Sequence, residues 1–163
     1  MEKIKQSIIA LLQDNARYSN EQIATMLNIS VDEVCNAIKA LENDGVIVKY
    51  TAVINNDRAN NESVNALIEV KVTPQKRSGF DSIANEIMKF DMVKNLYLMS
   101  GTFDLALTIE GKSMRDVALF VSERLSTIDA VVSTATHFIL KQYKNGGVML
   151  DSDVDEKREM VSV

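Results

Sequence analysis

Two serine motifs near the N-terminus constrain the fold most strongly. Ser19 is followed three residues later by Gln22, and Ser30 is followed at the same spacing by Glu33. This spacing is typical of a capping box, in which the two side chains satisfy backbone N–H groups at the start of a helix. The motifs therefore predict two helices. Asn28, which tolerates the left-handed conformation, is expected to end the first of them.

Apolar spacing predicts a further helix from about Lys3 to Asp14, and Gly45 is expected to end the last helix with positive φ. The inner faces are predicted to be Ile4, Ile8, Leu11 and Leu12; then Ile23, Ala24 and Leu27; then Val34, Ile38 and Leu41. Two short helices joined by a three-residue turn indicate a helix-turn-helix. The β-rich run from Val46 to Asn55 that follows predicts a strand pair, or wing. We therefore expect a winged helix-turn-helix DNA-binding domain over residues 1–54.

In such a domain the last helix lies in the major groove, where outward side chains contact bases and flanking groups hold phosphates. The candidate DNA-contacting residues are Ser30, Val31, Asp32, Asn36, Lys39 and Lys49. Residues 1–60 hold six Lys and Arg against eight Asp and Glu. Because phosphate neutralisation supplies most non-specific affinity, this balance keeps open an alternative: a domain that serves as a fold or oligomerisation unit without strong DNA binding.

The polar, Asn-rich residues 55–63 predict a linker, and a second domain is expected over residues 64–144. Its predicted elements are a strand from Val64 to Val72, a helix with Phe80, Ile83, Ala84, Ile87 and Phe90 inward, a hairpin from Val93 to Glu110, a helix capped by Ser113 and Asp116, and a strand from Ala130 to Leu140. The order β-α-β-β-α-β predicts an α+β, ferredoxin-like sandwich with both helices on one face of a four-stranded antiparallel sheet. Residues 145–163, with Gly146 and Gly147, are expected to form a mobile tail.

The other face of this sheet also carries apolar residues. If Val64 and its alternate neighbours face the helices, Leu67 faces away, and the second strand is apolar on both sides. An uncovered face of this kind is better explained by packing against a second sheet. We therefore expect a homodimer, whose paired reading units would suit a palindromic operator.

The hairpin turn is the candidate ligand site. Gly101 can adopt positive φ, and Ser100, Thr102 and Asp104 supply hydrogen-bonding groups. Most glycine turns only join strands, so turn chemistry alone leaves a structural role open.

Composition excludes several other functions. The chain of 163 residues has a net charge of −5, and its single Cys35 and single His137 cannot form an intramolecular disulfide or a Cys/His zinc cluster. It holds no nucleophile–base set, paired-carboxylate motif or phosphate loop, so we expect no enzyme, metal or cofactor. Without an apolar run of membrane length or a cleavable signal pattern, the chain is expected to be cytoplasmic, with no membrane partner.

Four landmarks occur together in one order: Asn28-Ile29-Ser30, the segment Leu41–Asn55 (LENDGVIVKYTAVIN), Ser100–Leu107 (SGTFDLAL) and Thr134–Leu140 (TATHFIL). With these motifs the chain resembles the Lrp/AsnC family of bacterial and archaeal feast/famine transcriptional regulators over most of its length.

The resemblance implies a C-terminal RAM-type ligand-sensing domain, dimers that assemble into octamers, and an amino acid or related metabolite as effector, bound between dimers. Carried onto this chain, the implied effector-binding residues are Leu98, Met99, Ser100, Gly101, Thr102, Phe103, Asp104, Thr134, Thr136 and His137. A zwitterion suits the turn, because its carboxylate can accept backbone N–H bonds while Asp104 receives the ammonium. His137 could equally be a packed or interface residue.

The chain departs from the family pattern at several positions. The family's recognition helix usually carries several arginines, where this chain has Ala37, Lys39 and Ala40, and Thr102 replaces the usual acidic residue after the glycine. Asn56–Asn61 replaces the customary linker Pro and Gly. The alternative is therefore an oligomeric small-molecule sensor or interaction protein that does not bind DNA. Siroheme decarboxylases share the architecture, but they would need more cationic or imidazole groups than His137 alone supplies.

Overall fold

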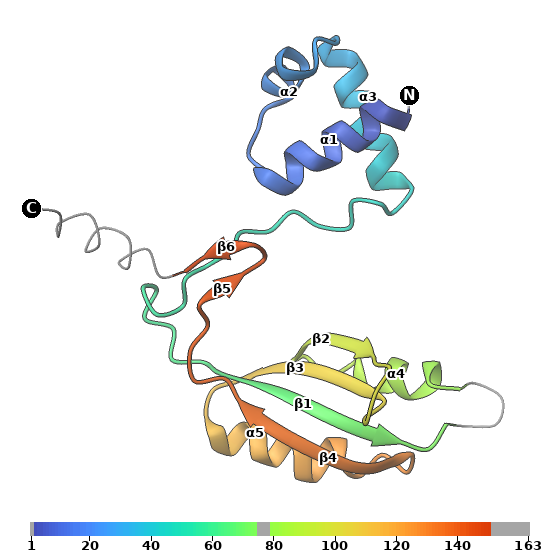
Figure 1. Ribbon diagram of the computed structural model, residues 1–163, viewed down its shortest axis with the longest axis vertical. Helices are drawn as coiled ribbons and strands as arrows, with labels where there is room; N and C mark the ends of the chain where they lie inside the picture. Colours follow the sequence, from blue (N-terminus) through green and yellow to red (C-terminus); the bar gives the residue numbers. More distant parts are fainter. Residues whose placement is uncertain (1, 75–78, 151–163) are drawn as a thin grey trace, which may run out of the picture. The chain divides into compact units, whose positions relative to one another are not determined.

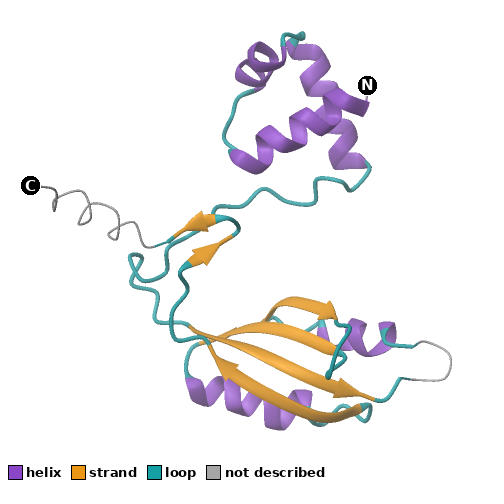
Figure 2. Cartoon of the chain, in the orientation of Figure 1, coloured by secondary structure: helices purple, strands orange, loops and turns teal. Residues whose placement is uncertain are grey.

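The chain forms two compact units, divided between Val53 and Ile54. A computed structural model describes residues 2–74 and 79–150 (Figures 1 and 2). The division falls one residue before the predicted start of the linker, which the second unit includes. Within the described ranges, no helix is long and apolar enough to cross a membrane. Each unit is described by itself below.

The first unit consists of the helices α1 (Glu2–Asp14), α2 (Asn20–Leu27) and α3 (Val31–Asn43). Both predicted capping boxes form. The N–H of Gln22 donates to Ser19 Oγ at 3.2 Å, and the N–H of Ser19 donates to Gln22 Oε1 at 2.9 Å. The equivalent bonds join Ser30 and Glu33, also at 3.2 and 2.9 Å. Each box satisfies backbone donors that the first turn of a helix leaves unpaired, which confirms the predicted helix starts.

The ends and inner faces of these helices also agree with the predictions. Asn28 ends α2 in the left-handed conformation with φ +52°, and Gly45 follows α3 with φ +69°. The buried core is Ile8, Ile23, Ala24, Val34 and Leu41, with Ile4, Leu11, Leu12, Leu27 and Ile38 packed against it. Helical periodicity therefore identified the apolar stripe of each helix correctly.

The strand pair predicted from Val46 to Asn55 does not form in the described chain. Within residues 2–74, no strand precedes Val64; the run from Val46 to Asn55 has no regular secondary structure, and Val48 is 88% exposed. Strand composition leads to a strand only where a partner supplies a hydrogen-bond ladder, and this run has no partner strand among the described residues. The phenol of Tyr50 instead donates to Glu42 Oε1 of α3 at 3.0 Å.

The second unit has the predicted β-α-β-β-α-β order. Its elements are β1 (Val64–Val72), α4 (Asp81–Ile87), β2 (Val93–Leu98), β3 (Leu105–Gly111), α5 (Met114–Phe120) and β4 (Val131–Phe138). The antiparallel sheet has the strand order β2-β3-β1-β4, and both helices lie on one face (Figure 1). A single π turn, η1 (Val121–Leu125), continues α5. Ser113 caps α5 by accepting the N–H of Asp116 at 3.1 Å.

The core lies between the sheet and its helices. The helix-facing residues Ala66, Ile68, Val70 and Val72 of β1 and Leu105, Leu107 and Ile109 of β3 are all buried. Alternation along β1 was thus predicted correctly, with Leu67 and Glu69 on the other face. On the helix-covered face of the sheet, Phe90 and Phe120 pack edge to face with ring centroids 5.3 Å apart.

Two details differ from the sequence expectations. Gly101 does not use its freedom to adopt positive φ. The segment expected to be a mobile tail begins with a small hairpin, β5 (Lys144–Asn145) and β6 (Val148–Met149), whose turn residues Gly146 and Gly147 have φ +53° and +85°. Positive φ at both central residues matches the twist of a tight hairpin, so the two glycines form structure rather than loosen it. The remainder of the predicted tail, residues 151–163, lies outside the described residues.

Candidate functional site

The predicted DNA-contacting side chains of α3 share one surface. Val31, Asp32, Asn36 and Lys39 are exposed and lie within an arc of about 140° that excludes the buried Val34. Ser30 is the exposed N-cap of α3, and Lys49 is exposed in the irregular segment that follows the helix. The capping box of Ser30 and Glu33 sets the first residue of α3, and the exposed face of a groove-reading helix starts there.

Charge along this face is mixed. Hydrogen bonds from the backbone and then the hydroxyl of Ser30 lower the pKa of Glu33, so a carboxylate stays at the N-terminal end of α3. The hydroxyl of Ser30 itself donates to Glu33 Oε2 at 2.8 Å. Among the described residues, neither Lys39 nor Lys49 forms an ion pair, so both ammonium groups are available to phosphates.

The hairpin turn is held against the end of β1. The N–H of Met99 donates to the carbonyl of Asp104 at 2.8 Å, and the N–H of Asp104 donates to the carbonyl of Val70 at 3.1 Å. The side chain of Asp104 also takes part, because its Oδ2 accepts the N–H of Val72 at 2.9 Å. Of the predicted effector-binding residues, Leu98 to Thr102 are exposed, whereas Phe103 and Asp104 are half-buried. The tip of the turn is therefore exposed to solvent, while hydrogen bonds to β1 hold its end at Asp104 in place.

The predicted effector-binding residues of β4 lie apart from this turn. Thr134 and Thr136 pair with Val70 and Ile68 and share their helix-facing side, whereas His137 pairs with Leu67 on the open side. His137 Nε2 lies 3.5 Å from Glu69 Oε1. Since β1 separates β3 from β4, the backbones of the two groups are about two strand spacings, or about 10 Å, apart. One protomer therefore does not bring all ten residues into a single site.

A cavity of about 1100 Å³ lies at the other end of the sheet, where Val64 pairs with Gly111. Its lining includes Ser63, Phe90, Met92, Phe120 and Arg124. Sequence reasoning missed it, because the lining comes from the linker, the α4–β2 connection, the end of β3, α5 and η1, and no short motif links these segments.

Comparison with known proteins agrees with this architecture. A family model described as the Lrp/AsnC ligand binding domain matches residues 65–149, and one described as winged helix-turn-helix DNA-binding matches residues 1–48. The uncharacterized HTH-type transcriptional regulator YugG of Bacillus subtilis (strain 168) is 48% identical over 156 residues, which cover 95% of this chain and 94% of that protein.

Solved structures share the fold at lower sequence identity. The transcriptional regulator NMB0573/L-Met complex from Neisseria meningitidis has a TM-score of 0.72 at 23% identity, with 89% of this chain and 93% of that chain covered. The feast or famine regulatory protein (Rv3291c) from M. tuberculosis complexed with L-methionine has a TM-score of 0.73 at 22% identity, with 91% and 98% covered. With both domain models matched in order and a full-length relative at 48% identity, the chain belongs to the Lrp/AsnC family of helix-turn-helix transcriptional regulators.

Proposed function

We propose that this regulator binds operator DNA through α3 and responds to an amino acid or a closely related metabolite bound at the turn Leu98–Asp104. The observation that carries this proposal is the combination, in one chain, of a capped reading helix and a turn with open backbone. Two structures of the same fold, named as complexes with L-methionine, support the ligand class. We infer that the chain acts in the cytoplasm, without catalysis, metal or cofactor.

The proposed DNA contacts are Ser30, Val31, Asp32, Asn36, Lys39 and Lys49. Fluorescence anisotropy with DNA from upstream of the gene, at two salt concentrations, tests them. Lys39→Ala and Lys49→Ala should each weaken binding and reduce the slope of log K against log salt by about 0.9, because each removes one phosphate contact. Lys89→Ala, an equal charge change in the second unit, should leave the slope unchanged. Absence of binding at low salt would defeat this part of the proposal.

The proposed effector site places the ligand carboxylate on backbone N–H groups of the turn and its ammonium near the Asp104 carboxylate. Gly101 provides a matched pair of variants, because a Cβ built there meets nothing within 4 Å and its φ is not in the left-handed region. Gly101→Ala should preserve the fold and the response to ligand, whereas Gly101→Trp should preserve the fold and block access. Thermal-shift screening with the amino acids tests this, and an equal response of both variants contradicts it.

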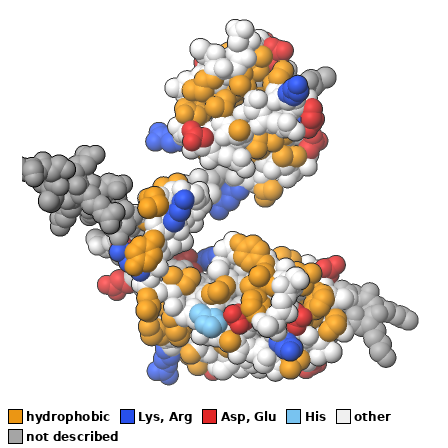
Figure 3. All heavy atoms as spheres, in the orientation of Figure 1, with side chains coloured by type: hydrophobic (Ala, Val, Ile, Leu, Met, Phe, Trp, Pro, Cys, Tyr) orange, Lys and Arg blue, Asp and Glu red, His pale blue; other side chains and the backbone are white. Residues whose placement is uncertain are grey.

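We further propose that the open face of the sheet pairs with that of a second copy. Leu67, Ala106 and Tyr97, which is 53% exposed, lie on this face beside Glu69 and His137. The surface is mixed, with apolar side chains around the one histidine, rather than continuously apolar (Figure 3). Burial of this face in a dimer would remove its apolar area from water.

Assembly beyond the dimer, to an octamer, would bring the turn of one copy near β4 of another. This would explain why Thr134, Thr136 and His137 lie apart from the turn within one chain. Light-scattering mass should exceed that of one chain at micromolar concentration, and Leu67→Lys should lower it. A wild-type protein that stays monomeric contradicts the assembly.

The second candidate function is an oligomeric sensor or interaction protein that does not bind DNA. The acidic residues Asp32, Glu33 and Glu42 of α3, against Lys39 as its cation, favour it. Under this alternative, the Lys39→Ala, Lys49→Ala double variant keeps its regulatory effect in cells. Loss of regulation in that variant supports the DNA-binding function.

A further inference from the structure

The cavity at the Ser63 end of β1 has no role in the proposed function. We propose that it binds a small aliphatic molecule with two ammonium groups, such as a diamine or a diamino acid, at a site separate from the turn. Val64 and Gly111 mark this end of the sheet, whereas the turn adjoins Val70, six residues along β1. At about 3.3 Å per residue, the two sites are about 20 Å apart.

The floor of the cavity is apolar. The edge-to-face pair Phe90 and Phe120 lines it, together with Met92 and with Leu119, which remains 40% exposed. Small-molecule sites characteristically combine such apolar lining with a few polar groups at the margin. A methylene chain can therefore lie on this apolar floor.

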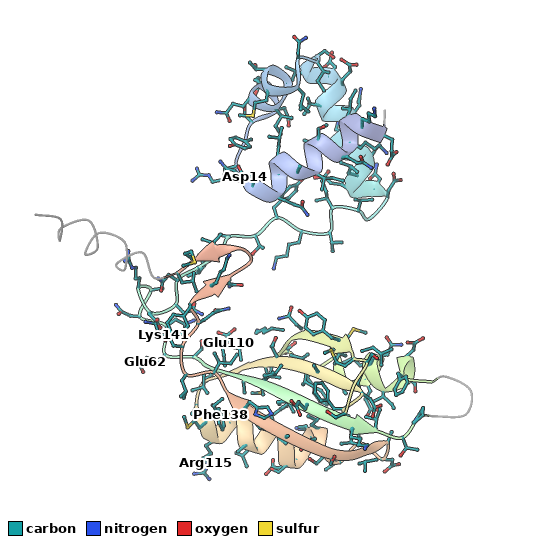
Figure 4. The ribbon with its side chains drawn as sticks, viewed as in Figure 1. Asp14, Glu62, Glu110, Arg115, Phe138 and Lys141 are labelled. Atoms are coloured by element: carbon teal, nitrogen blue, oxygen red, sulfur yellow. The ribbon has the colours of Figure 1, made fainter. Side chains whose placement is uncertain are left out.

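Charged side chains surround this floor with an excess of acid. They are Glu62, Asp91, Glu110, Asp116 and Glu123, against Lys94, Lys112 and Arg124. Lys94 Nζ lies 3.7 Å from Glu110 Oε2, which leaves four acids and two cations that form no ion pair among the described residues. The remaining charge of −2 is matched by a ligand with two ammonium groups. Figure 4 labels Glu62 and Glu110 near this end of the sheet.

A buried side-chain hydroxyl and a distorted helical turn also point to a ligand. Ser63 lines the cavity, and its Oγ is buried without a hydrogen-bond partner among the described residues. An orphaned buried hydroxyl requires an explanation, and a small rotation of this side chain toward the cavity would let a bound molecule supply the partner. Glu123 and Arg124 reach the cavity from the π turn η1, a distortion that is frequent at functional sites. Ser63 is the last residue of the predicted linker, so the lining of the cavity includes linker residues.

Methyl NMR on the full chain with 13C-labelled methionine tests the proposal, because the reporters are already in place. Met92 lies in the cavity, Met99 lies in the turn, and Met26 on α2 serves as a reference. The probes are 1,5-diaminopentane, L-lysine and L-norleucine. L-norleucine has an unbranched aliphatic side chain but lacks the second ammonium. The Met92 resonance should shift saturably with the first two probes and much less with norleucine.

Charge variants identify the groups responsible. The double variant Glu62→Gln, Glu123→Gln should weaken the binding of 1,5-diaminopentane and of L-lysine at least tenfold, about 1.4 kcal/mol. Glu86→Gln, on α4 outside the lining, should leave both affinities unchanged. Arg124→Gln distinguishes the two ligand sources. It should tighten 1,5-diaminopentane by removing a like charge, and it should weaken L-lysine if the carboxylate is recognised. Arg115→Gln on α5, outside the lining, is the matched control (Figure 4).

Each outcome decides the proposal. A Met92 resonance that does not shift with 1,5-diaminopentane or L-lysine overturns it. This holds even if the Met99 resonance responds to an amino acid, which would support the separate effector site at the turn Leu98–Asp104. An unsaturable shift of Met26, Met92 and Met99 together indicates diffuse binding to an acidic protein and also overturns it. Saturable Met92 shifts that the double variant abolishes, with the Met26 resonance and circular dichroism unchanged, support the site whether or not Met99 responds.

Discussion

The carboxylate of Asp104 is predicted to stabilise the protein before any ligand binds. Its Oδ2 accepts the N–H of Val72 at 2.9 Å, at the point where the turn meets the end of β1. Asp104→Ala removes this acceptor and leaves a partly buried N–H unpaired. Asp104→Asn keeps an acceptor oxygen at the same position but removes the charge.

The expected magnitude follows from this geometry. A hydrogen bond to a charged group contributes about 1.5–3 kcal/mol, and the half-buried position of Asp104 places the effect at the lower end, about 1.5–2 kcal/mol. For a domain of about this size, 1 kcal/mol corresponds to about 4 °C in Tm, so Asp104→Ala should lower the Tm of the second unit by about 6–8 °C. Asp104→Asn should lower it by about half as much, because its bond is neutral.

Circular dichroism during thermal unfolding measures this effect. All variants are compared at one protein concentration, because the Tm of a self-associating protein depends on concentration. Asp129→Ala is the control, since Asp129 is exposed and its side chain makes no hydrogen bond among the described residues. If Asp104→Ala and Asp129→Ala melt together without ligand and differ only in their response to amino acids, Asp104 acts in ligand recognition alone and this reasoning is wrong.

Three further predictions concern the helix caps and the sheet. Ser30→Ala should destabilise the first unit by about 1 kcal/mol in urea unfolding, because α3 loses its N-cap; an unchanged midpoint would contradict this. The lowered pKa of Glu33 means that its contribution to the cap is present above the usual pKa of 4.5 and is lost as pH falls through the lowered value. Unfolding of Glu33→Gln should lack that acid-dependent loss, since Gln also completes the box. Gly111→Ala should destabilise the second unit by about 1–3 kcal/mol, because a Cβ there lies 3.0 Å from Val117 Cγ2 and 3.2 Å from Met92 Cε; Gly101→Ala is the neutral comparison in the same Tm measurement.

Helix starts and strand faces could be predicted from the sequence because the interactions that determine them join residues close together in the chain. Ser19 with Gln22 and Ser30 with Glu33 determine helix starts by bonds across one turn, so the reading unit could be derived from the sequence. Alternation along Val64–Val72 likewise determined which side of the sheet faces the core.

Features that depend on distant partners were not predictable in the same way. The run after Gly45 has strand composition but pairs with no strand of the described chain, and composition cannot reveal that. Thr136 and His137 are adjacent in sequence and therefore face opposite sides of β4. The family resemblance implied all the effector-binding residues as one set, so it did not distinguish the two sides. The cavity near Ser63 depends on five separate segments, so only the folded chain reveals it.

The bond between the Asn55 side-chain amide and the Leu150 carbonyl, 2.6 Å long, has a practical consequence for rearranging the chain. It holds the entry to the ligand-binding unit beside the point where β6 ends. Domains whose two ends meet tolerate circular permutation. A gene that encodes residues 1–54 after Leu150 instead of before Asn55 should therefore still yield a protein in which both units fold.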